Sequence, residues 1–559
     1  MNKNIALGYH DFEEVRNRNL YYVDKTDFIQ RVIEAENKIF LFPRPRRFGK
    51  TLNLMMLRRF FEISETSKAH LFEGLKIQKW DKFERYQGKY PVIWLSFKDV
   101  KQQNWKDCFE KITIDIANEF RRHSYVLQSS ILSQDQREVY ERILSKKASV
   151  TEYQESILFL SEILFLIHSV RPILLLDEYD TPINNAFSCK FYQECVDFLR
   201  VFYSIGLKDN VFLEHAVLTG IYRVAKESIF SGLNNIKVST LLEEDFSDCF
   251  GFTPEEVRQL LVDFDAAKYE EEVKNWYNGY LFGKEQIIYN PWSILNFVDN
   301  PLREFKPYWA NTSNNDIIKE LIINSSTDVK VEIETLVQGG TLVKSITEEV
   351  VFGNIQQSPD ALWNFFLFSG YLKIIEKKIN NNIQYGVFKI PNIEIQLIFQ
   401  EAIQCWFVQS QTYDRFNVVL EYLKKGRLED FEGYFGDFIQ KVLSYYDFAD
   451  TEPECIYHAL VLGMMVQLQS EYRITSNRES GYGRYDVVLH PLNATLPAYV
   501  FEFKRFISSK ESSIEETLNN AMKQMLDNKY ASVLEQEGHA NIHHIAIAFK
   551  GKEVKMRYD

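Results

Sequence analysis

The sequence predicts an α/β protein with a parallel-sheet domain at the N-terminus, a mainly helical middle region and a smaller α/β domain at the C-terminus. Between residues 38 and 220, short apolar runs alternate with longer helical patterns, which is typical of a parallel sheet covered by helices. The pattern then becomes helical with aromatic-rich segments, and after about residue 450 strand patterns return between helical ones. The predicted domains are residues 1–240, 241–440 and 441–559.

The size and composition are those of a soluble globular protein. At 559 residues the chain exceeds the range of about 250 to 300 residues that one hydrophobic core serves, so we expect several domains. Hydrophobic residues make up 45% and charged residues 26% of the chain. The formal net charge of -13 excludes an overall basic coat, so any nucleic acid must be met by local Lys/Arg clusters.

Cysteine usage and the N-terminus indicate the compartment. The six cysteines are scattered and form no CxxC pair, which argues against a zinc ribbon and a disulfide scaffold. The first residues lack the apolar stretch of a signal peptide, and the richest apolar run, residues 157–167, is too short to cross a membrane. We therefore expect a cytoplasmic protein with no membrane segment.

Four strands are predicted in the N-terminal domain, at residues 39–42, 92–97, 173–176 and 212–218. The first leads into Gly49, Lys50 and Thr51 at the start of an amphipathic helix, which is the context of a P-loop. The helix start offers backbone N–H groups to a phosphate, Lys50 can reach the β and γ phosphates, and the Thr51 hydroxyl can bind Mg²⁺.

The loop itself departs from the general GxxxxGK[ST] motif. Arg44 stands at the position of the first glycine, and Pro45 removes one N–H from the phosphate cradle. The alternative interpretation is an ordinary helix start at which Arg44, Arg46 and Arg47 form a solvated basic patch.

Polar residues follow the next strands in the order that an ATPase requires. Asp177 ends an apolar strand and can hold the magnesium shell, while Glu178 can activate water for attack on the γ phosphate. The following strand ends near Thr219, where a polar residue can sense that phosphate, and Arg223 lies within one helical turn. Acidic residues after buried strands are common, so it is this order that favours nucleotide binding.

A second set of charged residues lies near the C-terminus, on two predicted strands joined by a turn. Asp486 is on the first strand, and Glu502 and Lys504 share one face of the second because they are two residues apart. If the hairpin pairs about position 494, Asp486 lies opposite Glu502. The two carboxylates can bind Mg²⁺, while Lys504 can orient or deprotonate the water that attacks a phosphodiester. The alternative is a surface salt bridge on a hairpin.

Flanking helical segments add two supporting residues. Glu454, with Tyr457 and His458, lies on one face of the preceding segment, and Gln524 lies near Tyr530 in the following one. Gln524 could point toward a metal-bound water or the scissile phosphate. There is no GxSxG elbow and no HExxH motif, which leaves the serine hydrolase and zinc protease classes without support.

The chain resembles a bacterial family of AAA-ATPase-like proteins that carry a C-terminal PD-(D/E)XK nuclease-superfamily domain. The resemblance spans nearly the whole chain and rests on motifs in one order: YYVDKT, RPRRFGKT, LLLDEYDTPI, LTGIYRVAKESIFSGLNN, YNGYLFG, YNPWSILNF, YWANT, FSGYL, ExxYH, GYGRYD and FEFK. It implies that Arg44 is the family's form of the P-loop, and it implies ATP, Mg²⁺ and a nuclease fold acting on DNA or RNA. Roles in phage defence or mobile elements are analogies at the level of the fold only.

These observations give a leading hypothesis and two alternatives. The leading hypothesis is an ATPase whose nucleotide state regulates a Mg²⁺-dependent nuclease. The first alternative is a nucleotide-switched scaffold whose inactive nuclease fold holds nucleic acid or a partner. A processive motor is the second, although no pore-loop motif is present. Arg223 could act within its own subunit or across to a neighbour, so a homo-oligomer stays open, and the type and strandedness of the nucleic acid are not determined.

Overall fold

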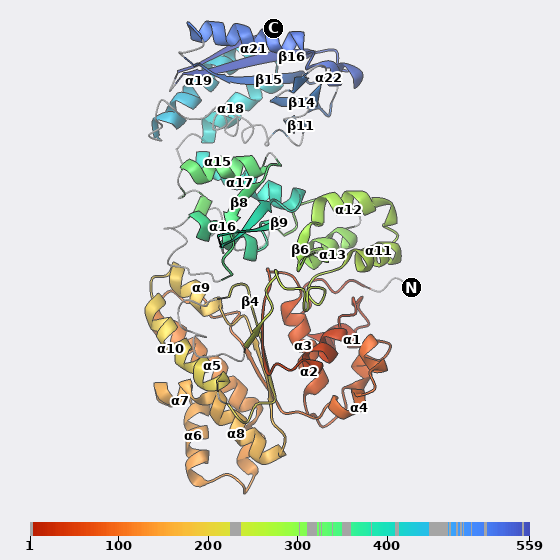
Figure 1. The fold of residues 1–559 in the computed structure, drawn as a ribbon, viewed down its shortest axis with the longest axis vertical. Helices are drawn as coiled ribbons and strands as arrows, with labels where there is room; N and C mark the ends of the chain where they lie inside the picture. Colours follow the sequence, from red (N-terminus) through yellow and green to blue (C-terminus); the bar gives the residue numbers. More distant parts are fainter. Residues whose placement is uncertain are drawn as a thin grey trace. The chain divides into compact units, whose positions relative to one another are not determined.

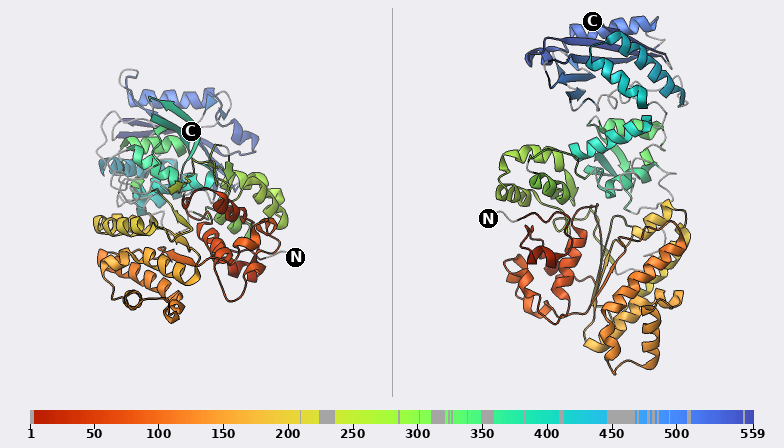
Figure 2. Two further views of the ribbon diagram at one scale, coloured as in Figure 1. Left: turned by 60° about the horizontal axis from the view of Figure 1, so that its bottom comes forward. Right: turned by 180° about the vertical axis from the view of Figure 1, so that it is seen from behind.

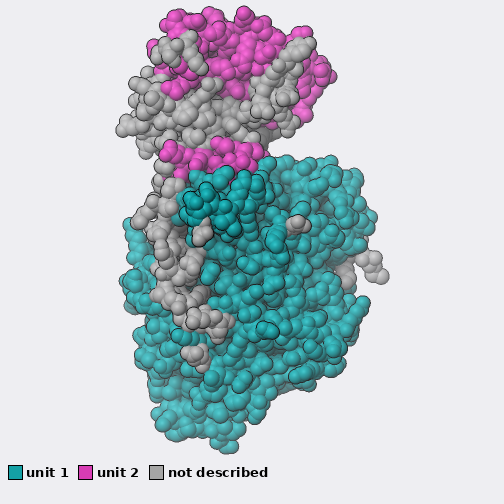
Figure 3. Space-filling model, in the orientation of Figure 1, with its two compact units in different colours: residues 1–311, 343–394 teal, residues 312–342, 395–559 magenta. Residues whose placement is uncertain are grey.

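The computed structural model describes residues 4–559 except 209, 224–235, 285, 301, 310–320, 323–324, 326, 338, 349–358, 382, 409–412, 446–467, 469–470, 477–478, 481–482, 485, 494, 508–510 and 551–552. Contacts group the chain into two compact units (Figure 3), residues 1–311 with 343–394 and residues 312–342 with 395–559. The middle of the sequence is thus shared between the two units. The boundaries at residues 240 and 440 remain a prediction.

A five-stranded parallel sheet forms the centre of the first unit, in the order β2-β3-β4-β1-β5. The four strands predicted from apolar runs are all present and parallel, which confirms that interpretation. The fifth, with only three residues, is too short to leave a sequence pattern. The strands are β1 (Ile39–Pro43), β2 (Val92–Ser96), β3 (Ile173–Asp177), β4 (His215–Gly220) and β5 (Ile236–Val238).

Helices cover both faces of this sheet (Figures 1 and 2). Every residue of β1 and β3 is buried, as expected for strands enclosed on both sides. One face carries α1 (Phe12–Asn17), α2 (Asp27–Glu34), α3 (Lys50–Phe61) and α4 (Phe83–Tyr86). The other carries α5 (Trp105–Arg122), α6 (Gln134–Leu144), α7 (Val150–Gln154), α8 (Ser156–His168), α9 (Thr181–Ser188) and α10 (Tyr192–Leu207).

The strand order decides which loops meet. Strand β4 lies between β1 and β3, although it comes last of the three in the chain. Because parallel strands end at one edge of a sheet, the segments that follow β1, β4 and β3 lie side by side there. The first unit therefore brings the predicted lysine, threonine and acidic segments to a single edge.

The remaining elements of the first unit form a helical subdomain and a small antiparallel sheet. The helices pack around a core that includes Leu260, Tyr277 and Phe297. The three-stranded sheet has the order β8-β10-β9. The elements are α11 (Pro254–Asp263), α12 (Glu270–Tyr277), β6 (Tyr280–Phe282), β7 (Gln286–Ile288), α13 (Pro291–Asp299), β8 (Leu342–Ser345), α16 (Pro359–Phe368), β9 (Lys373–Asn380) and β10 (Ile383–Lys389).

The second unit is built on a mixed five-stranded sheet in the order β11-β14-β15-β16-β17. It carries α21 on one face and α18 and α19 on the other (Figure 1). No helix in the described ranges is long and apolar enough to span a membrane. The elements are α15 (Thr327–Val337), α17 (Ile393–Val408), α18 (Tyr413–Lys424), α19 (Leu428–Tyr445), β11 (Tyr472–Ser476), β12 (Glu479–Ser480), β13 (Gly483–Arg484), β14 (Val487–Pro491), β15 (Ala498–Arg505), α21 (Ile514–Asp527), α22 (Ser532–Gln536), β16 (Ile542–Lys550) and β17 (Glu553–Tyr558).

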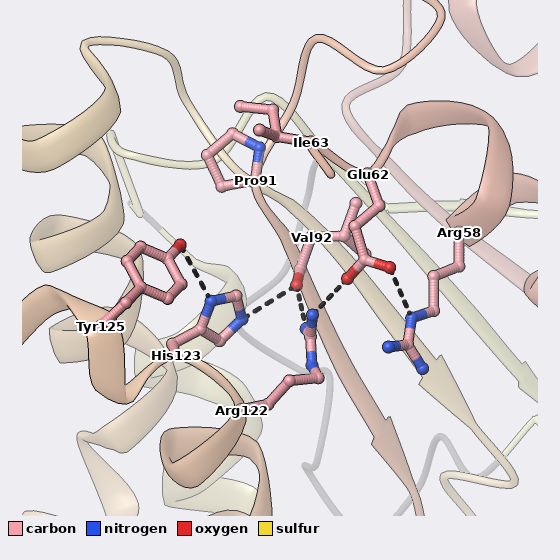
Figure 4. Close-up of a pocket in the computed structure, with 8 residues that line it drawn as sticks. All are labelled: Arg58, Glu62, Ile63, Pro91, Val92, Arg122, His123 and Tyr125. Carbon is pink, nitrogen blue, oxygen red and sulfur yellow. Dashed lines mark hydrogen bonds and ion pairs between the residues drawn. The ribbon is translucent and has the colours of Figure 1, made fainter. Parts of the chain in front are cut away.

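A cavity of about 270 Å³ lies at the N-terminal end of β2, at the opposite edge of the sheet from the segments that follow the strands (Figure 4). Arg122 pairs there with Glu62 and with the buried Glu119. Glu62 also accepts a hydrogen bond from Arg58. The arginines and carboxylates thus pair within one network, which anchors the ends of α3 and α5 to the edge strand.

Glu119 should contribute strongly to stability. Burial alone would raise its pKa, but Arg122 and His123 lower it to about 2, below its ordinary value of 4.5. This stabilisation is therefore fully present above pH 4.5 and is lost as the pH falls toward 2. We expect Glu119→Gln to cost about 3 kcal/mol at pH 7 in urea unfolding, because one partner of a buried pair is removed. The exposed Glu110→Gln on the same helix is the control, and an equal effect of both variants would contradict the expectation.

Candidate functional site

The loop of residues 44–50 joins β1 to α3 at the carboxyl edge of the sheet. Gly49 precedes the helix with φ 81°, a left-handed conformation that glycine adopts without strain. The buried Lys50 Nζ donates to the carbonyl oxygens of Arg44 and Pro45, each at 3.0 Å. Burial lowers the pKa of Lys50, and Glu178 and Asp177 oppose that shift. The lysine is thus held across the loop, beside two acidic residues.

Arg44 is fully buried, so the interpretation of residues 44–47 as a solvated patch is wrong for this residue. Its guanidinium donates to the carbonyl oxygens of Pro43 and Ser239. It also lies 5.3 Å from the ring centroids of both Phe250 and Phe282. Burial lowers its pKa to about 10. Arg44 therefore ties the loop to the chain after β5, which is a contact that a glycine could not make.

The two other arginines of the loop lie nearer the surface. Arg47 is exposed, has φ 67° and places its guanidinium 4.3 Å from the ring centroid of Trp292. Arg46 is half-buried, and its charge lowers the pKa values of Tyr222 and Tyr371, although burial raises both. These two arginines are the cations of the loop that solvent can reach.

Asp177, at the end of β3, is the centre of the polar cluster at this edge. Its Oδ2 accepts the Thr51 hydroxyl at 2.8 Å, and its Oδ1 accepts the Thr219 hydroxyl at 2.8 Å. Ser96, at the end of β2, donates to Oδ2 at 3.4 Å. Burial and the neighbouring Glu178 raise the pKa of Asp177, while the two threonines lower it. Hydroxyl groups from three other segments thus converge on one buried carboxylate.

Glu178 follows in an unusual backbone conformation. Its φ of 51° is rare outside glycine and is a strain often found at functional sites. The side chain is partly exposed and accepts the hydroxyl of Thr181 at 2.9 Å. Glu178 therefore lies next to the buried Asp177 but in reach of water.

Arg223, which follows β4 by three residues, is placed near but not in this cluster. Its Nη1 lies 3.7 Å from Oε2 of Glu348. Its side chain is one-third exposed, so solvent can reach it.

The donor set at this edge fits a magnesium nucleotide. Mg²⁺ prefers oxygen ligands and takes few from the protein, filling the rest with water and phosphate oxygens. Thr51 and Asp177 offer one hydroxyl and one carboxylate that already touch each other. Lys50 and the N-terminus of α3 supply positive charge for the phosphates.

The second candidate site lies on the β14–β15 hairpin. Val487 pairs with Phe501, which centres the hairpin on position 494 and places Asp486 opposite Glu502, confirming the predicted register. Oδ2 of Asp486 accepts the main-chain N–H of Phe503 at 2.8 Å. The two carboxylates thus come from neighbouring strands at one position along the sheet.

Glu502 and Lys504 lie on the face of β15 that α21 covers. Glu502 is only 1% exposed, and its Oε1 lies 2.7 Å from Nζ of Lys504. Their register partners on β16 are Ala546 and Ala548, whose small side chains leave room beside the charged pair. A buried carboxylate next to a lysine and opposite a second carboxylate matches the donor set of a one- or two-metal hydrolytic site.

Each of the two five-stranded sheets lies wholly or mostly in a segment that matches a known protein-family model. Residues 6–230 match the family model described as "Predicted AAA-ATPase", and residues 452–558 match that of the PD-(D/E)XK nuclease superfamily. The chain carries both domains. It is also similar to the "Uncharacterized protein in vnfD 5'region" of Azotobacter chroococcum mcd 1, with 27% identity over 572 residues, 98% of this chain and 96% of the relative.

Of the two supporting residues predicted for the nuclease-superfamily domain, the structure describes one. Gln524, near the end of α21, donates to the hydroxyl of Tyr530 at 3.0 Å. Glu454, with Tyr457 and His458, falls outside the described residues. Both roles remain predictions.

The structure adds residues to the AAA-ATPase site that sequence reasoning missed. Ser96 reaches Asp177 from β2, and its position at the end of a predicted strand was a usable signal. Asp180, three residues after Asp177, is fully buried and contacts the chain after β4. Its place in the same acidic segment was the only sign available in the sequence.

Asp177 should destabilise the ligand-free AAA-ATPase domain at neutral pH. Its pKa is raised above the ordinary 3.8, so the folded state binds the proton more tightly and stability falls as the pH rises above 3.8. We expect Asp177→Asn to melt higher than wild type at pH 7, by roughly 2 to 4 °C for each kcal/mol gained. The difference should shrink toward pH 4 in a calorimetric series, and a variant that melts lower at pH 7 would contradict this account.

Proposed function

We propose that the protein binds and hydrolyses ATP at the carboxyl edge of its parallel sheet, and that its nucleotide state regulates a Mg²⁺-dependent nuclease in the C-terminal domain. The observation that carries the ATPase half is that Thr51 and Thr219 both donate to Asp177, whose charge also acts on the buried Lys50. We take the domains as residues 1–240, 241–440 and 441–559, in a cytoplasmic protein.

Each residue at the sheet edge has a part in this proposal. Lys50 and the N–H groups after Gly49 hold the phosphates, while Thr51 and Asp177 hold Mg²⁺. Glu178 orients and deprotonates the attacking water, and Thr219 and Arg223 contact the γ phosphate. When bound, Mg²⁺ neutralises charge that develops on the phosphates.

In the nuclease half, Asp486 and Glu502 hold Mg²⁺, and Lys504 orients or deprotonates the water that attacks DNA or RNA. A bound metal ion stabilises charge on the scissile phosphate and activates that water. The ion pair of Lys504 with Glu502 at 2.7 Å supports this role, because it places the ammonium beside the metal ligand. Glu454 and Gln524 assist in binding water or phosphate.

Regulation is supported by contacts between the nucleotide site and the segment that leads to the second unit. Gly370 has φ 89°, and a Cβ there would lie 2.8 Å from Cβ of Pro45 in the 44–50 loop. The Tyr222 hydroxyl lies 2.8 Å from Oγ of Ser369, and its ring stacks on Phe365 at 4.9 Å. A phosphate that moves the loop or the chain after β4 must therefore disturb this turn.

The chain from that turn runs directly to the other unit. After β9 and β10 it enters α17 at Ile393, and Ile395 already belongs to the second unit. Fewer than 30 residues thus separate the contact with Pro45 from the second unit. In this proposal, the short connection passes the nucleotide state on to the second unit.

A nucleotide-switched scaffold is the second candidate. One observation favours it: the formal net charge of -13. In this case the nuclease-superfamily domain binds nucleic acid or a partner without cutting it.

The test is cleavage of single- and double-stranded DNA and RNA with Mg²⁺ or Mn²⁺, with and without ATP. Wild type is compared with Lys50→Ala and Lys504→Ala. Cleavage that Lys504→Ala abolishes and Lys50→Ala alters would support the proposal. Binding of nucleic acid that depends on ATP, with no cleavage under any condition, would favour the scaffold.

Arg46 and Arg47 should compensate for the missing first glycine of the loop. They are the cations of the loop nearest to solvent, whereas Arg44 is buried in the protein. We expect the double variant Arg46→Ala/Arg47→Ala to bind ATP about 10-fold more weakly, since a charge-assisted contact contributes about 1.5 kcal/mol. Fluorescent ATP titration measures this, and an unchanged affinity would remove the role. Arg121→Ala, on the exposed end of α5, is the control.

A further inference from the structure

Asp180 is a fully buried acid in the segment that follows β3. Its Oδ2 accepts two main-chain N–H groups, those of Ile221 and Tyr222, both at 2.9 Å. These are the first two residues after β4. One carboxylate oxygen therefore fixes the path of the chain where it leaves the sheet.

Residues 177–180 make further hydrogen bonds to the end of β4 and the chain that follows it. The Tyr179 N–H donates to the carbonyl of Thr219 at 3.0 Å, and the Tyr179 hydroxyl donates to the carbonyl of Tyr222 at 2.6 Å. The Thr219 hydroxyl in turn donates to Asp177 at 2.8 Å. Both sides of the turn after β4 are thus hydrogen-bonded to residues 177–180.

Gly220 permits this close approach. A Cβ there would lie 2.6 Å from Oδ1 of Asp180 and 2.6 Å from the Tyr179 ring, closer than real Cβ atoms come. The glycine is therefore needed for space and not for a left-handed turn. Gly220 therefore lets the segments that follow β3 and β4 lie in contact.

The residue that follows is Arg223, whose Nη1 lies 3.7 Å from Oε2 of Glu348. Since Asp180 fixes Ile221 and Tyr222, it also fixes where the Arg223 side chain leaves the sheet edge. A misplacement of about 1 Å at a reacting group can cost about 100-fold in rate. The Asp180 carboxylate can thus influence where the Arg223 side chain lies without contacting the reacting groups.

We propose that Asp180 is a positioning residue of the ATPase, which holds the chain after β4 so that Thr219 and Arg223 meet the γ phosphate during hydrolysis. This inference rests on the proposed ATPase function. Hydrogen bonds that an ionised carboxylate accepts are roughly twice as strong as neutral ones. An acid is therefore better suited than an amide to hold two N–H groups with one oxygen.

Asp180→Ala, Asp180→Asn and Tyr179→Phe in the full-length protein test this proposal, with Asp197→Asn, at a partly exposed position on α10, as control. We expect Asp180→Ala to lower kcat for ATP about 10- to 100-fold while the Kd for ATP changes by less than about threefold. Asp180→Asn should recover part of kcat, because its amide oxygen can still accept. Tyr179→Phe should lower kcat less, since it removes one bond to Tyr222.

Amide hydrogen exchange gives a readout that does not depend on turnover. The Ile221 and Tyr222 amides should be protected in wild type and in Asp197→Asn, and should exchange faster in Asp180→Ala. An unchanged kcat in Asp180→Ala, or a loss of ATP affinity as large as the loss of kcat, would overturn the positioning role. A folded wild type that binds and hydrolyses no ATP, yet shows these exchange differences, would instead overturn the proposed function. If Asp180→Ala does not fold, Asp180→Asn and Tyr179→Phe decide the question by the same two measurements.

Discussion

Glu178→Gln is expected to stop ATP turnover while leaving ATP bound. Glu178 is the partly exposed acid next to the buried Asp177, so it is the carboxylate that can take a proton from water. Removing a general base lowers kcat by about 10² to 10⁴-fold. Glutamine keeps the size of the side chain and its oxygen for Thr181, so the Kd for ATP should change little. Phosphate release under saturating ATP measures kcat, and equilibrium titration measures Kd.

Two further variants serve as comparisons for Glu178→Gln. Lys50→Ala should lose ATP binding itself, because the loop then lacks the ammonium that faces the phosphates. Glu194→Gln, an exposed residue on α10, should behave as wild type. Full turnover in Glu178→Gln would mean that another residue is the general base. Asp180 is too deeply buried to take that role directly.

Glu502→Gln and Lys504→Ala are each expected to reduce cleavage by about 10³-fold or more. Loss of a metal ligand or of the group that activates water removes several kcal/mol of transition-state stabilisation, and each 1.36 kcal/mol is tenfold in rate. Glu502→Gln keeps the shape of a side chain that is 1% exposed. The fold of the domain should therefore survive, which thermal melting checks.

The control for this pair is Lys523→Ala, an exposed lysine on α21. Rates are measured with end-labelled DNA and RNA at several Mg²⁺ and Mn²⁺ concentrations. If Glu502→Gln binds metal and cleaves like wild type, the hairpin is not the catalytic site. If no protein cleaves but nucleic acid still binds in an ATP-dependent way, the scaffold function holds.

Local patterns were enough to find most of the elements. The strands β1 to β4 are continuous apolar runs, and such runs are what a strand buried on both faces requires. The register of the C-terminal hairpin also followed from sequence, because residues of opposite strands pair about the centre of a short turn. Gly49 and Lys50 could be identified because a phosphate-binding helix start is recognised from neighbouring residues alone.

Other features depended on contacts between distant residues. Strand order is not encoded in the apolar pattern, so the position of β4 between β1 and β3 could not be read from the chain. The alternative interpretation took Arg44 as a solvated cation, but its guanidinium lies against aromatic rings more than 200 residues away. The contact of Tyr222 with Ser369 likewise joins segments about 150 residues apart.

The sequence by itself determined four strands of the first sheet, the hairpin of the second, the loop before α3 and the residue types of both candidate sites, because these follow from local periodicity and from the chemistry of single residues. Only the tertiary structure decided which side chains meet: Asp177 with Thr51 and Thr219, Asp180 with the chain after β4, and Gly370 with Pro45. Such meetings depend on the packing of whole elements, and the burial of large apolar surfaces fixes them rather than any pattern of neighbouring residues.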